Sequence, residues 1–320
     1  MRLRRNVSLI LLRRVFGSGS LAGCLLLILV CAHSTTAVAY AEGSFQRTLQ
    51  VTGPVNLDVS TGSGSIQIRT GATNQVQVTG HIKTRDWLGG NGEEKVKQLQ
   101  ANPPILQSGN DIRIGHIDDS ELRQNVSISY ELVVPGETQL HSHTGSGELK
   151  ITDIGDTVRA DTGSGDVQID RVKGNVRART GSGSIHATAI GGGFEANTGS
   201  GHITLEQTSP GAVRADTGSG GMELRGVRGS LEAKAGSGTI RAEGDPTGAW
   251  VVHTGSGGVQ LRFPSGAAFD LDAHTSSGSI SVDHPVTVQG TVGRKQIRGK
   301  VRGGGVPVEV ETGSGNIEIQ

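Results

Sequence analysis

The feature that most constrains this chain is a four-residue string, Thr-Gly-Ser-Gly, that recurs at nearly constant intervals. The string begins at Thr61, Thr144, Thr162, Thr180, Thr198, Thr217, Thr254 and Thr312, and related strings begin at Ala235 and Thr275. From Thr144 to Thr254 the spacing between successive strings is 18 or 19 residues. A constant period of this length is typical of stacked-repeat proteins, in which each repeat packs on its neighbours.

Each repeat alternates apolar or Thr side chains with charged ones on both sides of its Gly-Ser-Gly string. Residues 158–162 read Val-Arg-Ala-Asp-Thr, and residues 167–170 read Val-Gln-Ile-Asp. This period of two is expected for strands that bury one face, so each repeat should form two short strands and two corners. The sequence therefore predicts an all-β fold, a single-stranded β-helix (β-solenoid) with coils of about 18 residues.

The corner residues have separate expected roles. Gly on both sides of Ser allows positive φ angles, and the Ser hydroxyl can bond to the neighbouring backbone. The β-branched Thr is expected to point inward and stack on its copy in the next coil. Gly supplies 51 of the 320 residues and aromatic residues only 3%. This composition favours thin layers of small side chains over one large core.

Two other β architectures fit the pattern less well. An up-and-down hairpin meander would leave one apolar face uncovered unless it closed into a wide barrel. A left-handed hexapeptide helix also has 18-residue coils, but it requires an aliphatic residue at every sixth position. Val158, Ser164 and Asp170 do not supply that series.

The region before the regular repeats differs from them. Residues 42–140 are predicted to form an N-terminal β-rich cap and the first strands, with one short helix at 93–101 that stops before Pro103. The β-solenoid of Thr-Gly-Ser-Gly repeats is expected over residues 141–320. Because the last unit finishes with residues 316–320, an uncovered edge there would be a template for strand addition.

Residues 1–41 have the order of a secretory signal peptide. Five arginines precede an apolar run at 21–32, and small residues lead to a cleavage position after Ala41. Lipidation at Cys24 and retention as an anchor are the alternatives, although the run is shorter than the roughly 20 residues that span a bilayer. We expect an exported protein, located in the periplasm, on the cell surface or outside the cell.

Cleavage of this leader would remove both cysteines and five of the 30 basic residues. The mature chain would carry 25 basic and 30 acidic residues, a net charge of −5. No disulfide could then support the fold. A mildly acidic chain does not indicate a nucleic-acid partner.

No residue pattern predicts a catalytic, cofactor or metal site. Asp161 and Asp216 begin strings that resemble the aspartic-protease motif, but the same position in the other units varies. His141, His143 and His186 are expected on different coils or exposed corners rather than around a zinc ion. The position after Gly-Ser-Gly carries no series of carboxylates for calcium. We therefore predict no enzyme activity and no cofactor.

Two further groups of side chains bear on function. A β-helical polysaccharide lyase or hydrolase would need converging carboxylates and aromatic platforms. The aromatic residues available for it are Phe194, Trp250, Phe263 and Phe269. A basic cluster before the last unit comprises Arg294, Lys295, Arg298, Lys300 and Arg302. We interpret this cluster as a solvated loop insertion, the alternative being a contact for an anionic envelope polymer or headgroup.

The chain resembles the bacterial DUF4097 proteins, for which adhesion has been proposed. The resemblance is carried by the strand at 126–135 ending Leu-Val-Val-Pro, by the repeat series, and by residues 299–305 with the unit that follows. It covers about residues 45–320 and implies a β-helix on an exported or envelope-facing protein. The prediction is a non-enzymatic, adhesin-like interaction module whose partner is an envelope protein or glycan. A carbohydrate-active enzyme and an envelope-stress accessory protein are the alternatives.

Overall fold

The computed structural model describes residues 39–72, 74–86, 91–288 and 293–320. By internal contacts the chain divides into residues 1–37 and a unit spanning Val38–Gln320, to which this description applies. Most of the predicted signal peptide, with both cysteines, lies outside the described residues. Its predicted cleavage position, Ala41, falls in the first strand, β1 (Ala39–Gln50).

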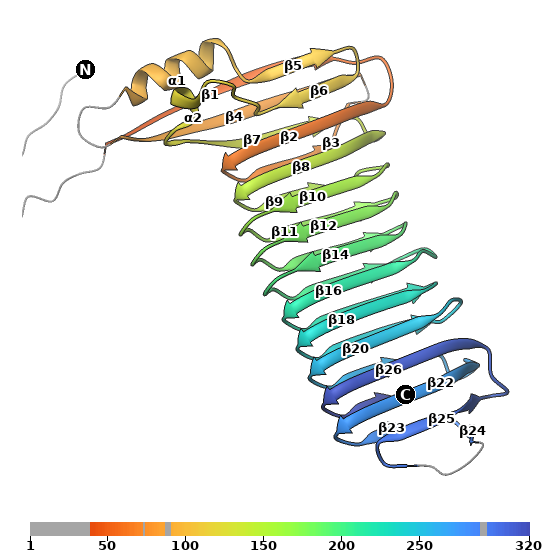
Figure 1. Ribbon diagram of the computed structural model, residues 1–320. Helices are drawn as coiled ribbons and strands as arrows, with labels where there is room; N and C mark the ends of the chain where they lie inside the picture. Colours follow the sequence, from red (N-terminus) through yellow and green to blue (C-terminus); the bar gives the residue numbers. More distant parts are fainter. Residues whose placement is uncertain (1–38, 73, 87–90, 289–292) are drawn as a thin grey trace, which may run out of the picture. The chain divides into compact units, whose positions relative to one another are not determined.

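The described strands form two sheets, of 13 and 14 strands, that we call sheet A and sheet B. In the regular part each coil gives one strand to each sheet, and equivalent strands pair in parallel, as Figure 1 shows for the successive rungs. In sheet B the strands of these coils are β10 (Val158–Thr162), β12 (Val176–Thr180), β14 (Phe194–Thr198), β16 (Val213–Ser219), β18 (Leu231–Ser237) and β20 (Trp250–Ser256). Their counterparts in sheet A are β11 (Val167–Val172), β13 (Ile185–Ile190), β15 (Ile203–Gln207), β17 (Met222–Arg228), β19 (Ile240–Asp245) and β21 (Val259–Arg262).

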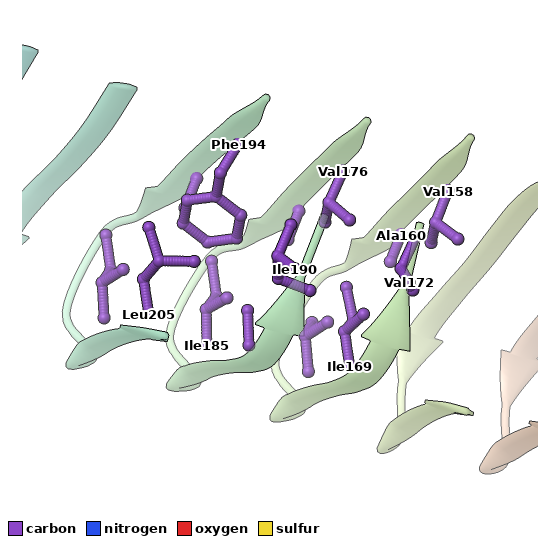
Figure 2. Packing of buried hydrophobic residues seen from close by; sticks show 14 of the residues in the cluster. Val158, Ala160, Ile169, Val172, Val176, Ile185, Ile190, Phe194 and Leu205 are labelled. Atoms are coloured by element: carbon purple, nitrogen blue, oxygen red, sulfur yellow. The ribbon is translucent and has the colours of Figure 1, made fainter. Parts of the chain in front are cut away.

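The predicted β-solenoid is confirmed, and its register follows the sequence period. Val158 pairs with Val176, and Val176 pairs with Phe194, so equivalent apolar positions lie directly over one another. Figure 2 shows these three side chains in line, facing Ile169 and its neighbours from sheet A. All are buried, because alternate residues of each strand point between the two sheets.

The corner threonines form a column of hydrogen bonds along the stack. In eight corners the Thr hydroxyl donates to the carbonyl of the second corner glycine in the adjacent coil, at 2.8 to 3.2 Å. Thr61 has no coil beneath it and donates to Ile128 O of the cap at 2.8 Å. The inward orientation expected for Thr is therefore confirmed, and the hydroxyl has a partner that the sequence did not reveal.

The corner glycines are required mainly because the coils approach closely. A side chain at Gly165 would begin 1.7 Å from Gly147 O in the adjacent coil, and one at Gly183 would begin 1.9 Å from Gly165 O. Positive φ occurs at the second glycine of five corners, between 150° and 156°, and at no first glycine in the described corners. The expectation of positive φ on both sides of Ser is thus only partly met.

The first coil is made by β2 (Val55–Ser63) and β3 (Ile66–Thr70). It stacks on β8 (Thr138–Ser146) and β9 (Leu149–Thr152), although more than 60 residues separate the two coils in sequence. The intervening segment forms β4 (Gln75–Asp86) and β7 (Val126–Val134), which continue sheet A next to β1, and β5 (Ile105–Ser108) and β6 (Asp111–Ile114), which continue sheet B. These strands shield the first coil.

Two helices accompany the cap strands. The predicted short helix is present as α1 (Gly92–Ala101) and buries Val96 and Leu99. A second helix, α2 (Ser120–Arg123), was not predicted. Asp119 caps this single turn, and its carboxylate accepts hydrogen bonds from two backbone N–H groups. The prediction of one helix in the cap is therefore incomplete.

The last repeat unit is not at the edge of the stack. It comprises β26 (Val306–Ser314), which lies between β20 and β22 (Phe269–Ser277), and β27 (Ile317–Ile319), which lies between β21 and β23 (Ile280–Val282). The expectation of an uncovered edge at residues 316–320 is wrong, because this unit pairs in parallel on both sides.

The basic cluster before that unit is also more regular than expected. Two of its five residues, Arg298 and Lys300, lie on β25 (Gln296–Val301), which pairs antiparallel with β22 and with β24 (Val286–Val288). The interpretation as a solvated loop insertion is wrong for this strand, since Ile297 and Val301 alternate with exposed polar residues. It holds for the exposed Arg294, Lys295 and Arg302, which lie in the bends and turn on either side.

Candidate functional site

The outer face of sheet B carries two rows of polar side chains that cross the coils. The first row comprises the second residue of each regular strand, and the register places Arg159, Arg177, Glu195, Arg214 and Glu232 side by side. The second row lies two residues further along each strand, directly before the corner Thr. Because equivalent positions repeat about every 4.8 Å, each row is a ladder of side chains along the stack.

Neighbouring members of the ladder are joined by ion pairs. Arg177 Nη2 lies 3.1 Å from Glu195 Oε1, and Arg214 Nη1 lies 2.9 Å from Glu232 Oε2. Their side chains are between 34% and 53% exposed, so these pairs contribute little to stability. The ladder therefore matters for the charge pattern that it gives the surface more than for the stability of the fold.

A groove follows the first row where the strands of sheet B begin. Its volume is about 850 Å³, and it crosses β12, β14, β16, β18 and β20, a span of about 19 Å at the usual strand spacing. The hollow exists because small residues precede the strands, including Gly193, Ala212 and Ala249. The ladder side chains from Arg177 to Glu232 stand along this hollow.

The charges that line the groove balance one another. Two arginines and two glutamates contribute to it, in the alternating order Arg177, Glu195, Arg214 and Glu232. The pKa of Glu232 lies below its ordinary range, chiefly because Lys234 donates a hydrogen bond to it. Arg177 Nε is buried and has no hydrogen-bond partner among the described residues.

The acidic and histidine candidates from the sequence do not converge. Asp161 and Asp216 lie three strands apart in sheet B, and each has an arginine partner two residues before it, so they cannot share a proton. His141 lies on β8 in sheet B between Asp58 and Asp161, whereas His186 lies on β13 in sheet A.

His143 is on the same outward face as His141, two residues away on β8. In the part of the chain that the structure describes, no three His, Cys, Asp or Glu side chains are grouped to hold a metal ion.

The aromatic candidates lie inside the solenoid rather than on its surface. Phe194, Trp250, Phe263 and Phe269 are at most 5% exposed. The rings of Trp250, Phe263 and Phe269 follow one another at centroid distances of 5.0 and 4.8 Å. They fill the core near the C-terminal coils and offer no platform for a sugar ring.

The basic cluster is partly neutralised by strand β22. Arg298 Nε donates to Asp272 Oδ2 at 3.0 Å, and Lys300 lies opposite Asp270 in the antiparallel register. Lys295 Nζ donates to Ser276 O at 2.9 Å. Arg294 and Arg302 are exposed. The cluster is therefore not a concentrated positive patch.

Comparison with known proteins places the chain in a family. The family model called Toastrack DUF4097 matches residues 55–320. The chain belongs to the Toastrack DUF4097 family. The family resemblance seen in the sequence is therefore confirmed. No curated protein matches this Toastrack chain.

Three crystal structures are similar to this Toastrack protein, and each covers 87% of its chain. One is a proposed lipid-binding protein from Parabacteroides distasonis, with a TM-score of 0.50, 12% identity and 97% of its own chain covered. The second is a proposed adhesin from Bacteroides fragilis, with a TM-score of 0.33, 11% identity and 97% coverage. The third is a proposed cell adhesion protein from Clostridium sporogenes, with a TM-score of 0.22, 11% identity and 99% coverage. At such identities the similarity concerns the fold.

Neither helix of the described residues has the length and apolar character needed to cross a membrane.

Proposed function

We propose that this Toastrack protein is an exported, non-enzymatic interaction module of the cell envelope, and that its groove on sheet B binds an extended glycan. The observation that carries the proposal is the groove itself, which continues across five strands and is lined by an alternating series of Arg and Glu. A ligand that contacts all of these residues must extend along the stack.

The charge balance favours a neutral or zwitterionic polysaccharide. Arginine supplies only hydrogen-bond donors and ionised glutamate only acceptors, whereas a sugar hydroxyl both donates and accepts. Glu195 and Glu232 would repel a strongly anionic polymer, and Arg177 and Arg214 would repel a cationic one. An extended peptide would normally bind by adding a strand at a sheet edge, and this groove lies on a face of paired strands.

The state of the carboxylates supports binding without catalysis. A glycoside hydrolase needs a carboxylic acid whose pKa is raised so that it can protonate the leaving group. In the groove Glu195 pairs with Arg177 and Arg179, and the pKa of Glu232 is shifted downward by Lys234 and Arg214. The ionised form of Glu232 is thus favoured, which is the opposite of what such an acid needs.

Export is supported by the order of residues 1–41, with arginines, an apolar run and small residues before Ala41. Localisation is tested by expressing the full chain and sequencing its mature N-terminus by mass spectrometry. We expect the mature chain to begin at Glu42 and to be recovered from the envelope or the medium. An uncleaved chain found only in the cytoplasm would refute the proposed location.

Glycan binding is tested by affinity electrophoresis of the processed protein in gels that contain neutral, zwitterionic or anionic polysaccharides. We expect retardation by at least one neutral or zwitterionic glycan, and about tenfold weaker binding after Arg177→Ala with Arg214→Ala. The matched control is Arg225→Ala with Arg241→Ala, which removes two exposed arginines from the outer face of sheet A.

Two results would overturn this function. One is that no neutral or zwitterionic glycan retards the protein, or that the control variant loses as much binding as the groove variant. The other is that incubation with the bound glycan releases new reducing ends or unsaturated sugars, which would make the protein an enzyme.

A further inference from the structure

A second cavity lies at the junction of the cap and the first coil. Its volume is about 620 Å³, within the usual range for small-molecule sites, and it shares no lining residue with the groove on sheet B. It is lined by the first corner at 61–63, the end of β4 at 83–85, residues 115 and 117, and residues 123, 125–128 and 130. The corner is accessible here because Thr61 faces the cap instead of another coil.

The charged side chains that line this cavity all have the same sign. Lys83, Arg85 and Arg123 contribute to the lining, and no acidic residue does. Lys83 Nζ forms an ion pair at 3.1 Å with Oε1 of Glu42, a residue that does not line the cavity. Within the described residues Arg85 and Arg123 form no ion pair. Two unpaired guanidinium groups at one cavity favour an anion, and arginine can bind a carboxylate or phosphate through two parallel hydrogen bonds.

Tyr130 adds an unsatisfied hydrogen-bonding group to the same cavity. The residue is 1% exposed, its ring packs edge-on against Phe45, and its hydroxyl has no partner among the described residues. Buried polar groups are normally paired, and an unpaired one requires an explanation. Because burial raises the pKa of Tyr130, the hydroxyl remains protonated and can donate.

Gly115 lines the cavity next to this hydroxyl, and any side chain at position 115 would crowd it. A side chain there would begin 3.3 Å from Tyr130 Oη and 1.7 Å from Ser60 O. The φ angle of Gly115 is +90°, a value that other residues rarely adopt. The loop is therefore built to pass close to the first coil without filling the cavity.

Part of the lining is apolar. Ile117, Val126 and Ile128 contribute to the cavity together with the ring of Tyr130. Ile117 and Val126 are only partly buried, so they retain apolar surface that a ligand could cover. A site that combines two arginines, a buried hydroxyl and aliphatic side chains matches a ligand with one anionic end and one apolar end.

We propose that this cavity binds a small amphiphilic anion, a carboxylate or phosphate attached to a short apolar chain. Arg85 and Arg123 hold the anionic group, Tyr130 donates a hydrogen bond to it, and Ile117 and Val126 contact the apolar part. The site is independent of the groove and of the glycan that the groove is proposed to bind.

The proposal is tested by isothermal titration calorimetry of the processed protein with octanoate, acetate and octanol. We expect saturable binding of octanoate at least tenfold tighter than of acetate or octanol, and weaker binding as salt is added. Arg85→Ala and Arg123→Ala should each weaken octanoate binding at least fivefold. Arg69→Ala, an exposed arginine on β3 away from the cavity, is the matched control and should bind as the unaltered protein does.

Tyr130→Phe separates a ligand site from a structural role. The substitution removes only the unpartnered hydroxyl, so the melting temperature should stay the same or rise while octanoate affinity falls at least threefold. Equal binding of octanol and octanoate, or unchanged affinity in both arginine variants and in Tyr130→Phe, would overturn the proposal. So would binding to anionic phospholipid vesicles without any binding of free octanoate, because the partner would then be a membrane surface.

Discussion

The corner threonine can be tested by removing its hydroxyl while its shape is kept. Thr198 is 2% exposed, and its hydroxyl donates to Gly183 O at 2.8 Å and accepts from Gly201 N at 3.1 Å. In Thr198→Val both backbone groups lose their partner, and water cannot replace it inside the stack. Each unsatisfied buried group costs about 1 to 3 kcal/mol, so for the two groups we expect a loss of about 2 to 6 kcal/mol in the free energy of unfolding.

The same column offers the reverse experiment. Ala235 replaces the corner Thr in one coil, is 4% exposed, and lies in register between Thr217 and Thr254. By the geometry of the other coils, a Thr at this position would donate to Gly220 O. Ala235→Thr should therefore raise the free energy of unfolding by about 0.5 to 1.5 kcal/mol. Ala235→Val, which adds the same bulk without a hydroxyl, is the control.

Both changes are measured by urea denaturation together with amide hydrogen exchange. Exchange is needed because coils of a solenoid can open locally, so that a single global free energy does not report every coil. Protection should fall at the coils next to residue 198 and rise at those next to residue 235. The reasoning is refuted if Thr198→Val changes stability by less than about 0.5 kcal/mol, or if Ala235→Thr is no more stable than Ala235→Val.

Three further perturbations test the close packing, the surface ladder and the buried tyrosine. Gly165→Ala should unfold the protein at clearly lower urea concentration, because its new methyl group would begin 1.7 Å from a backbone oxygen, whereas Gly62→Ala has no atom within 4 Å and should be tolerated. Arg214→Ala should cost at most about 1 kcal/mol in thermal unfolding, and less at high salt, because its ion pairs are half-exposed. Burial raises the pKa of Tyr130, so above its ordinary pKa of about 10 the unfolded chain ionises this residue while the folded state keeps it protonated, and the free energy of unfolding falls; below that pH the residue adds no pH dependence. Urea midpoints between pH 8 and pH 11 should therefore fall less steeply for Tyr130→Phe than for the unaltered protein.

The structure of a single coil could be predicted from the sequence, but the order in which the coils stack could not. A period of 18 or 19 residues and strict alternation were enough to predict the two strands, the buried Val158 and Ala160, and the inward Thr162. The insertion of β26 between β20 and β22 could not be predicted, because all corners share one pattern and each can stack on any other. The only sign of it in the sequence was the irregular spacing of the strings after Thr254, and this spacing did not show which coil stacks on which.

The corrected features have local physical reasons. Helix α2 is a single turn held by Asp119, too short to show a helical period. Strand β25 does alternate, with Ile297 and Val301 on one side, but its high charge concealed the pattern. The groove results from small residues before successive strands, such as Gly193 and Ala212, which the sequence places at a regular interval. That regular interval could have been used to predict the groove. The cavity beside Tyr130 could not be predicted in this way, because it depends on the path of the cap, which contains no repeat.

The insertion of the last unit also bears on which surfaces can meet a partner. Because β26 and β27 are paired on both sides, the described sheets end at that side in β24 and β23, each three residues long, instead of in a full-length repeat strand. Short edge strands are poor templates for pairing, and the neighbouring strand β25 carries Arg298 and Lys300, whose charge further disfavours edge-to-edge contact with a second copy. Strand addition by the last unit is therefore disfavoured, and binding is expected on the faces and corners of the coils. Both cavities lie there, one over the starts of the sheet B strands and one at the first corner, where the regular stacking of coils stops.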